Sequence, residues 1–501
     1  MAVGRTDTGR RLVPRVAARV PESVRRAAWP ALLVVAGLAL LVALAIGAGR
    51  QRELAVLVGT GPPGVVGYLR AAPVAVAVVA VAIALVRLAR HTDHVLARGL
   101  RRFAHLPRRI AAAVAVVLLV VIAVTLVNSV ALRTALAVAD AAFDGVNAET
   151  YPGDVPPVSP TRSGSPASSV PWGSLGREGR AFVVGGRPAA ELAAASARPA
   201  REPVRVYVGL ESAPDAAARA ELAVAELERT GAFSRAVLAV VTTTGTGWVD
   251  DPVSDDLELI QGGDTAIVAT QYSYLPSWLS FLVDGGRADE EGRQLFDAVH
   301  NRIAAMPPGV PRPRLVTFGE SLGSQGSEAA FSSLADVRAQ AEGALWVGPP
   351  HGNRLFSQLV ERRDPGTREV APTYADGLVV RFGGGPATAR IGGSPPTPWI
   401  APHLLYLQHP SDPVVRWTPA LLWSRPDWLV EPRGDDVLGA MSWYPVVTFW
   451  QVTVDPAAAT SVPDGHGHVY ASEMLDGWVA VATPDGWTPT DTERARAVAV
   501  R

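Results

Sequence analysis

The residue with the clearest chemical context is Ser321, at the centre of the stretch 319–323 (GESLG). This G-x-S-x-G sequence directly follows the apolar run 314–318 (RLVTF) and directly precedes a helical stretch. A strand, a sharp turn and a helix in this order expose the serine hydroxyl as a nucleophile, and the glycines leave room for neighbouring backbone. The helix N-terminus favours negative charge that develops nearby. The alternative is that Ser321 is an ordinary helix N-cap.

A serine nucleophile of this kind needs a carboxylate and a histidine, which follow it along the chain in that order. Asp412 lies just past the apolar run 404–408, and the stretch 464–468 (DGHGH) offers His468 or His466. We prefer His468, because a small residue, glycine, histidine and a hydrophobic residue in succession is the commoner form of this loop. The alternative for Asp412 is a helix cap or an Asx turn before the proline that follows.

The oxyanion of an acyl-transfer reaction needs backbone N–H donors. One donor is expected from Leu322, the residue after the nucleophile. For the second, two loops compete, 210–212 and 244–248 (TGTGW). The glycine-rich loop, with Gly245 and Thr246, is the better anion cradle by composition, and the alternative is an ordinary connecting turn.

The composition excludes several other kinds of chemistry. The chain has no cysteine, and all 46 of its basic residues are arginine, so neither a thiolate site nor a lysine Schiff base is available. His466 and His468 form an H-x-H pair, but no further ligand follows at the spacing of a hydrolytic metal site. A formal net charge of −1 creates no field that recruits nucleic acid. We therefore expect no metal, no cofactor and no nucleic-acid partner.

The elements that must position these residues follow an alternating pattern from about residue 203 onwards. Continuous apolar runs between helical stretches are typical of a parallel sheet buried on both faces, and so of an α/β fold. The predicted strands are Val204–Gly209, Ala236–Thr243, Thr265–Thr270, Arg314–Phe318, Ala344–Val347, Leu404–Gln408 and Val446–Val454, and the predicted helices are Ala213–Arg229, Asp289–Met306 and Ser321–Glu342.

The first quarter of the chain is much more apolar than this region. The runs 29–48 and 110–132 are 20 and 23 residues long and uncharged, which is enough to cross a bilayer. The shorter run 71–86 is flanked by arginines that can snorkel to the interfaces, whereas 54–68 is broken by glycine and proline and is expected to be an interfacial or re-entrant loop. A cleaved signal peptide is the alternative for the first run.

The placement of arginine orients these three predicted spans. The tail before residue 29 and the loop 87–109 hold seven arginines each, against three in 49–70. The positive-inside rule then places the rich segments in the cytoplasm and everything after residue 132 outside it. We expect an all-α transmembrane domain in the inner (plasma) membrane, with the lipid bilayer as a partner. The predicted organisation is a cytoplasmic tail (1–28), a transmembrane domain (29–134), a Pro/Ser/Gly-rich linker (135–202) and a catalytic domain (203–501).

Five stretches of the chain resemble the bacterial integral-membrane α/β-hydrolase family, whose members carry a multi-span domain ahead of a hydrolase domain. The stretches are RTGAFSRAVLAVVTTTGTGWVD (229–250), QYSYLPSWLSFLVD (271–284), FGESLGSQG (318–326), LYLQHPSDPVVRW (405–417) and GHGHVY (465–470). The resemblance implies an α/β-hydrolase fold with Ser321 as nucleophile. By position, Asp412 and one of the two histidines then complete the triad.

These observations predict a membrane-anchored serine hydrolase that acts on a small-molecule or lipid ester through an acyl-enzyme. The Trp-rich segments 272–282 and 417–428 are expected to line an acyl pocket, rest on the bilayer or pack in the core. One alternative is an acyltransferase for envelope lipids with the same triad. The other is a non-catalytic membrane scaffold on a hydrolase-like fold.

Overall fold

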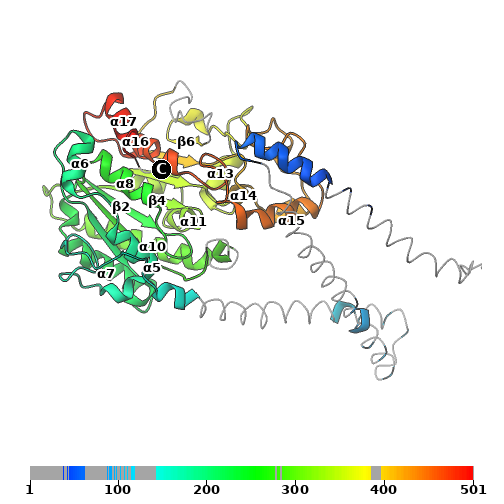
Figure 1. Cartoon of the computed structure of the whole chain (residues 1–501), viewed down its shortest axis with the longest axis horizontal. Helices are drawn as coiled ribbons and strands as arrows, with labels where there is room; N and C mark the ends of the chain where they lie inside the picture. The colour runs from blue at the N-terminus through cyan, green and yellow to red at the C-terminus, as the bar shows by residue number, and fades with distance from the viewer. Residues whose placement is uncertain are drawn as a thin grey trace, which may run out of the picture.

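The computed structural model describes residues 143–276, 279–281, 285–384 and 397–499, together with 45–61 and scattered positions between 38 and 118 (Figure 1). Within these residues, no helix combines the length and the apolar character that crossing a bilayer requires. The predicted span 71–86 lies outside the described residues, as do most positions of 29–48 and 110–132.

A seven-stranded sheet forms the centre of the fold, and all of its strand pairs are parallel. The strand order is β1-β3-β2-β4-β5-β7-β6. Six of the predicted strands are confirmed. Their continuous apolar sequences fit a parallel sheet that is buried on both faces. Their bounds are β1 Val204–Val208, β2 Val237–Thr242, β3 Thr265–Thr270, β4 Arg314–Glu320, β5 Gly343–Val347 and β7 His403–Leu407; the short edge strand β6, Val380–Gly383, was not expected.

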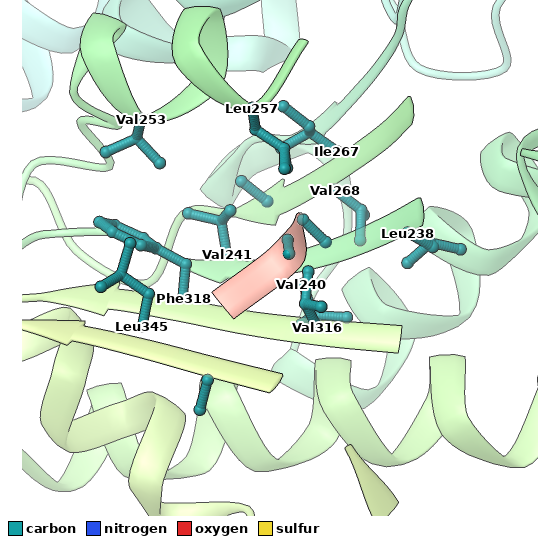
Figure 2. Close-up of a cluster of buried hydrophobic side chains, with 14 of the residues drawn as sticks. Leu238, Val240, Val241, Val253, Leu257, Ile267, Val268, Val316, Phe318 and Leu345 are labelled. Carbon is teal, nitrogen blue, oxygen red and sulfur yellow. The ribbon is translucent and has the colours of Figure 1, made fainter. Parts of the chain in front are cut away.

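Helices cover both faces of the sheet (Figure 1). One layer contains α8 (Asp251–Ile260), α16 (Met474–Ala482) and α17 (Pro489–Arg496), and the other contains α7 (Ala216–Arg229), α10 (Gly285–Ala304), α11 (Leu322–Ala329) and α13 (Arg354–Glu361). Figure 2 shows part of the core, where Val253 and Leu257 of α8 face strand residues such as Ile267 and Phe318. These side chains are almost fully buried, as an α/β fold requires.

Two predicted elements differ in the structure. Val446–Val454 is not a strand but the helix α15, Val447–Val454. A run rich in β-branched residues favours a strand locally. In the structure, Thr448 and Val452 are buried, and residues four apart share one face of a helix. Packing of that face therefore outweighs the local preference for a strand. The predicted helix 321–342 is divided into α11 and α12 (Leu334–Gln340), and Ser333 caps the second helix.

The Pro/Ser/Gly-rich segment before β1 is packed against the edge of the sheet. Thr161 and Ser163 exchange backbone hydrogen bonds with Arg205 of β1, so the segment runs parallel to that strand. It continues into α5 (Gly176–Val184), which packs on β1, and α6 (Ala189–Ser196), which packs on α8. The segment therefore covers an edge strand that would otherwise present unpaired backbone groups.

A buried ionic cluster joins β1 to α8. Arg205 has no exposed surface and donates to Glu258 at 2.7 and 2.9 Å, to Asp255 at 2.6 Å and to the carbonyl of Phe182 at 2.9 Å. Burial alone lowers the pKa of Arg205, but the two carboxylates outweigh it and raise the pKa above its usual value. Arg205 therefore stays charged, and Glu258, whose own pKa is raised by burial, depends on it as a partner.

Replacing this arginine is expected to destabilise the fold. In Arg205→Met, Glu258 is left buried without its partner, which costs about 3–5 kcal/mol of the free energy of unfolding. The matched control is Arg201→Met, whose ion pair with Asp264 is half exposed and contributes about 1 kcal/mol or less. Urea denaturation of the purified chain measures both. Equal losses in the two variants would show that the cluster has no special role.

Candidate active site

Ser321 occupies the sharp turn between β4 and α11. Its φ of 53° and ψ of −129° lie outside the regions that a non-glycine residue adopts easily. Such a conformation costs of order 1–3 kcal/mol and persists only where the surroundings hold it. Here the Ser321 N–H donates to the carbonyl of Val347 on β5, at 2.9 Å.

The two glycines of the turn are required by close backbone contacts. A Cβ on Gly319 would lie 2.3 Å from the carbonyl oxygen of Gly323, and a Cβ on Gly323 would lie 2.3 Å from that of Thr242 on β2. Both distances are far below van der Waals contact. The start of α11 can therefore approach β2 and β4 only because these positions have no side chain, as the sequence predicted.

Asp412 and His468 lie together on the neighbouring loops. Asp412 lies in the loop after β7 and has no exposed surface, and its Oδ2 is 2.7 Å from Nδ1 of His468. The same oxygen accepts from the Tyr470 hydroxyl at 2.7 Å, and Oδ1 accepts from the N–H of Val414 at 2.8 Å. Asp412 thus caps the short helix α14 (Pro413–Arg416) and also binds the histidine. The contact to His468 and the helix cap, both considered from the sequence, are therefore both present.

His466 and His409 have other partners. Nδ1 of His466 is 3.3 Å from Asp436, which also accepts from the Ser411 hydroxyl. His409 is buried, with its ring nitrogens 2.9 Å from the Gly467 carbonyl and 3.0 Å from Glu473. Of these three histidine rings, only that of His468 bonds to the Asp412 carboxylate.

The environment of His468 favours its protonated form. Burial alone lowers the pKa of His468, but the Asp412 carboxylate and the nearby Glu320 outweigh it, so the pKa lies above its usual value. Glu320 is itself buried, and burial together with Asp412 raises its pKa. Asp250 adds a half-buried carboxyl whose pKa is raised by desolvation and by Glu320. Asp412 and Glu320 therefore act on the histidine directly, and Asp250 interacts with Glu320.

The sheet order separates the two candidate oxyanion loops. The loop 243–248 follows β2, which pairs with β4 so that Thr242 is opposite Gly319. The loop 210–212 follows β1, which is two strands away from β2. In the described residues, no acceptor takes a hydrogen bond from the N–H of Gly245 or of Thr246. The N–H of Leu322 opens α11 and has no carbonyl within the helix to bind.

A cavity of about 430 Å³ joins these groups, within the usual size range of ligand pockets. Ser321 and His468 both line it, and Nε2 of His468 is buried without a hydrogen-bond partner in the described chain. One part of the wall is apolar and includes Phe281, whose ring meets Trp417 edge to face at 5.5 Å. The other lining residues are Tyr151, Glu178, Thr244, Thr246, Trp248, Val414, Pro456, Ala457, Ala459 and Thr460.

Several residues of this site were not singled out from the sequence. Tyr470 donates to Asp412, and its place two residues after His468 was a usable signal. Tyr151 and Glu178 come from the Pro/Ser/Gly-rich segment and its first helix, are joined by a 3.1 Å hydrogen bond and reach the cavity. Nothing in their local sequence marks them, because only the packing of that segment on β1 brings them there.

The described residues contain no group of three or more His, Asp or Glu side chains arranged to hold a metal ion. Comparison with known proteins identifies two regions of similarity. Residues 204–495 match the model of a family described as an alpha/beta-hydrolase family, and residues 3–187 match the model of that family's N-terminus. No curated protein matches the chain.

Proposed function

The chain belongs to the alpha/beta-hydrolase family, and we propose that it is a membrane-anchored serine hydrolase acting on a carboxylic ester. One observation carries the proposal most strongly. Asp412 binds Nδ1 of His468, while Nε2 of the same ring is unpartnered in the described chain and lines the cavity that Ser321 also lines. This is the arrangement that activates a serine hydroxyl.

In the proposed reaction, Oγ of Ser321 attacks the ester carbonyl carbon, and Nε2 of His468 takes the hydroxyl proton. Asp412 holds Nδ1–H and stabilises the imidazolium that forms. The N–H of Leu322 and that of Gly245 or Thr246 donate to the oxyanion. The alcohol leaves with the proton from His468, which forms the acyl-enzyme. Water then attacks, His468 takes its proton and returns it to Ser321, and the acid is released.

The helix at residues 45–57 supports the three-span topology. Leu54 lines a small cavity together with Pro413 and Val452, so this helix contacts the hydrolase region. Spans at 29–48, 71–86 and 110–132 leave residues 49–70 on the same side of the membrane as everything after 132, and the contact is then possible. A fourth span at 54–68 would instead put residues 49–53 and everything after 132 on opposite sides of the membrane.

Replacing the proposed nucleophile and base tests this function. Ser321→Ala and His468→Ala are each expected to lower kcat for p-nitrophenyl butyrate by about 10⁴-fold or more. The matched control is His466→Ala, which removes a histidine that binds Asp436 instead and should change kcat by less than about tenfold. Steady-state kinetics measure all three variants. Full activity of Ser321→Ala would refute the proposal.

The pH profile tests the electrostatics around the base. Because His468 must be neutral to accept the proton and its pKa is raised, kcat/KM should rise with pH through a midpoint above 6.5. Glu320→Gln removes a charge that raises this pKa, so the acid limb should move to lower pH. Glu342→Gln, which changes an exposed carboxylate just before β5, is the control and should leave the limb in place. An unmoved limb in Glu320→Gln would show that Glu320 does not act on His468.

A further inference from the structure

The outer face of α15 is an unusually exposed apolar surface. Val447, Trp450 and Val454 lie on one side of this helix, and the last two are 59 % and 62 % exposed. Hydrogen bonds from Trp443 to the Leu421 carbonyl and from Val446 to the Leu422 carbonyl hold two neighbouring segments beside it. We call this surface the α15 patch; its residues are Trp423, Tyr444, Val446, Val447, Trp450 and Val454.

The sequence of α15 does not suit a surface exposed to water. Five of its eight residues are apolar, yet only Thr448 and Val452 are buried. Residues 437–454 contain no charged side chain. A contiguous exposed patch of this kind marks an interaction site.

The patch is joined directly to the rim of the candidate active site. The 3-10 helix η8 (Asp455–Ala458) follows α15 without a break, and Pro456 and Ala457 line the cavity. A chain of ring contacts makes the same link, since Phe449 of α15 meets Trp417 at 6.0 Å and Trp417 meets Phe281 at 5.5 Å. An apolar partner on α15 would therefore lie at the mouth of the cavity.

The position of the helix at 45–57 identifies that partner. Figure 1 shows this blue helix beside α15, and Leu54 and Val452 line one small cavity between them. Its outward side chains Ile46 and Val56 are also exposed. In the sequence, this helix overlaps the end of the apolar run 29–48 and precedes the run 71–86, so the proposed spans bring the membrane next to the patch. Trp and Tyr, both present in the patch, are the residues enriched at membrane interfaces.

We propose that the α15 patch inserts into the interfacial layer of the bilayer and that the substrate, a lipid ester resident in that bilayer, enters the cavity directly from it. This inference rests on the proposed function for the class of substrate, and it adds the route by which the substrate enters the cavity. Interfacial helices of this type bury their apolar face by about 5–10 Å.

The absence of cysteine makes the docking directly measurable. Single-cysteine chains Trp450→Cys and Val454→Cys, labelled with an NBD fluorophore and reconstituted in phosphatidylcholine–phosphatidylglycerol nanodiscs, should be quenched by doxyl-labelled lipid. The matched control is Val310→Cys, which should not be quenched. Val310 is 45 % exposed and lies in the loop before β4, at the ends of the strands opposite to the candidate active site. Absence of quenching at both patch positions overturns the proposal. Cross-linking between Trp450→Cys chains without quenching would identify a second copy as the partner instead.

A kinetic comparison tests the route. Trp450→Glu should lower the hydrolysis of a bilayer-resident palmitoyl ester by at least about tenfold, because a charge opposes insertion, and should leave the soluble acetyl ester of the same alcohol unchanged. Val310→Glu should change neither rate. Equal loss on both esters, or no loss on either, contradicts entry from the bilayer. If the unmutated chain hydrolyses neither ester, the proposed function fails, and the quenching result alone decides whether the patch docks.

Discussion

The contact between Asp412 and His468 is the interaction around which the candidate site is organised. Asp412 has no exposed surface, and a buried carboxyl group is costly unless hydrogen bonds satisfy it. Three donors do so here, from Val414, His468 and Tyr470. The loop after β7 and the loop that carries His468 are thereby fixed to each other. Nε2 of His468 takes no part in these contacts and faces the cavity that Ser321 lines.

The parallel sheet explains why the remaining groups converge. The carboxyl ends of parallel strands lie at one edge, so the segments that follow β2, β4 and β7 meet there although they are far apart in the sequence. The strained backbone of Ser321 is held by the Val347 carbonyl on one side and by the close packing of α11 on β2 on the other. The packing of the sheet thus holds Ser321 in a backbone conformation that is unfavourable by itself.

The sequence predicts those features that depend on a local pattern. Buried strands such as β2 and β4 have continuous apolar sequences. The G-x-S-x-G turn can be recognised because a strand precedes it and a helix follows it. α15 was missed because a run of β-branched residues has the same pattern whether it lies in a strand or on an apolar helix.

Features set by long-range packing could not be predicted in this way. His466 and His468 are separated by one residue, and only the positions of Asp436 and Asp412 distinguish them. Likewise, only the strand order tells which loop lies beside Ser321. Tyr151 and Glu178 reach the cavity through a segment whose composition is typical of a linker. The membrane spans remain predictions from the apolar runs and the arginine distribution.

Activation of Ser321 as the nucleophile can be tested by peptide mapping of the chain after reaction with a fluorophosphonate. Trypsin cleaves after Arg314 and Arg338, and the peptide between them contains five serines, at positions 321, 324, 327, 332 and 333. Fragmentation by tandem mass spectrometry locates the adduct among them. We expect a single phosphonyl group on Ser321, and no labelling when the chain is unfolded before the reaction. An adduct on another residue, or ester hydrolysis that continues without any adduct, would contradict it.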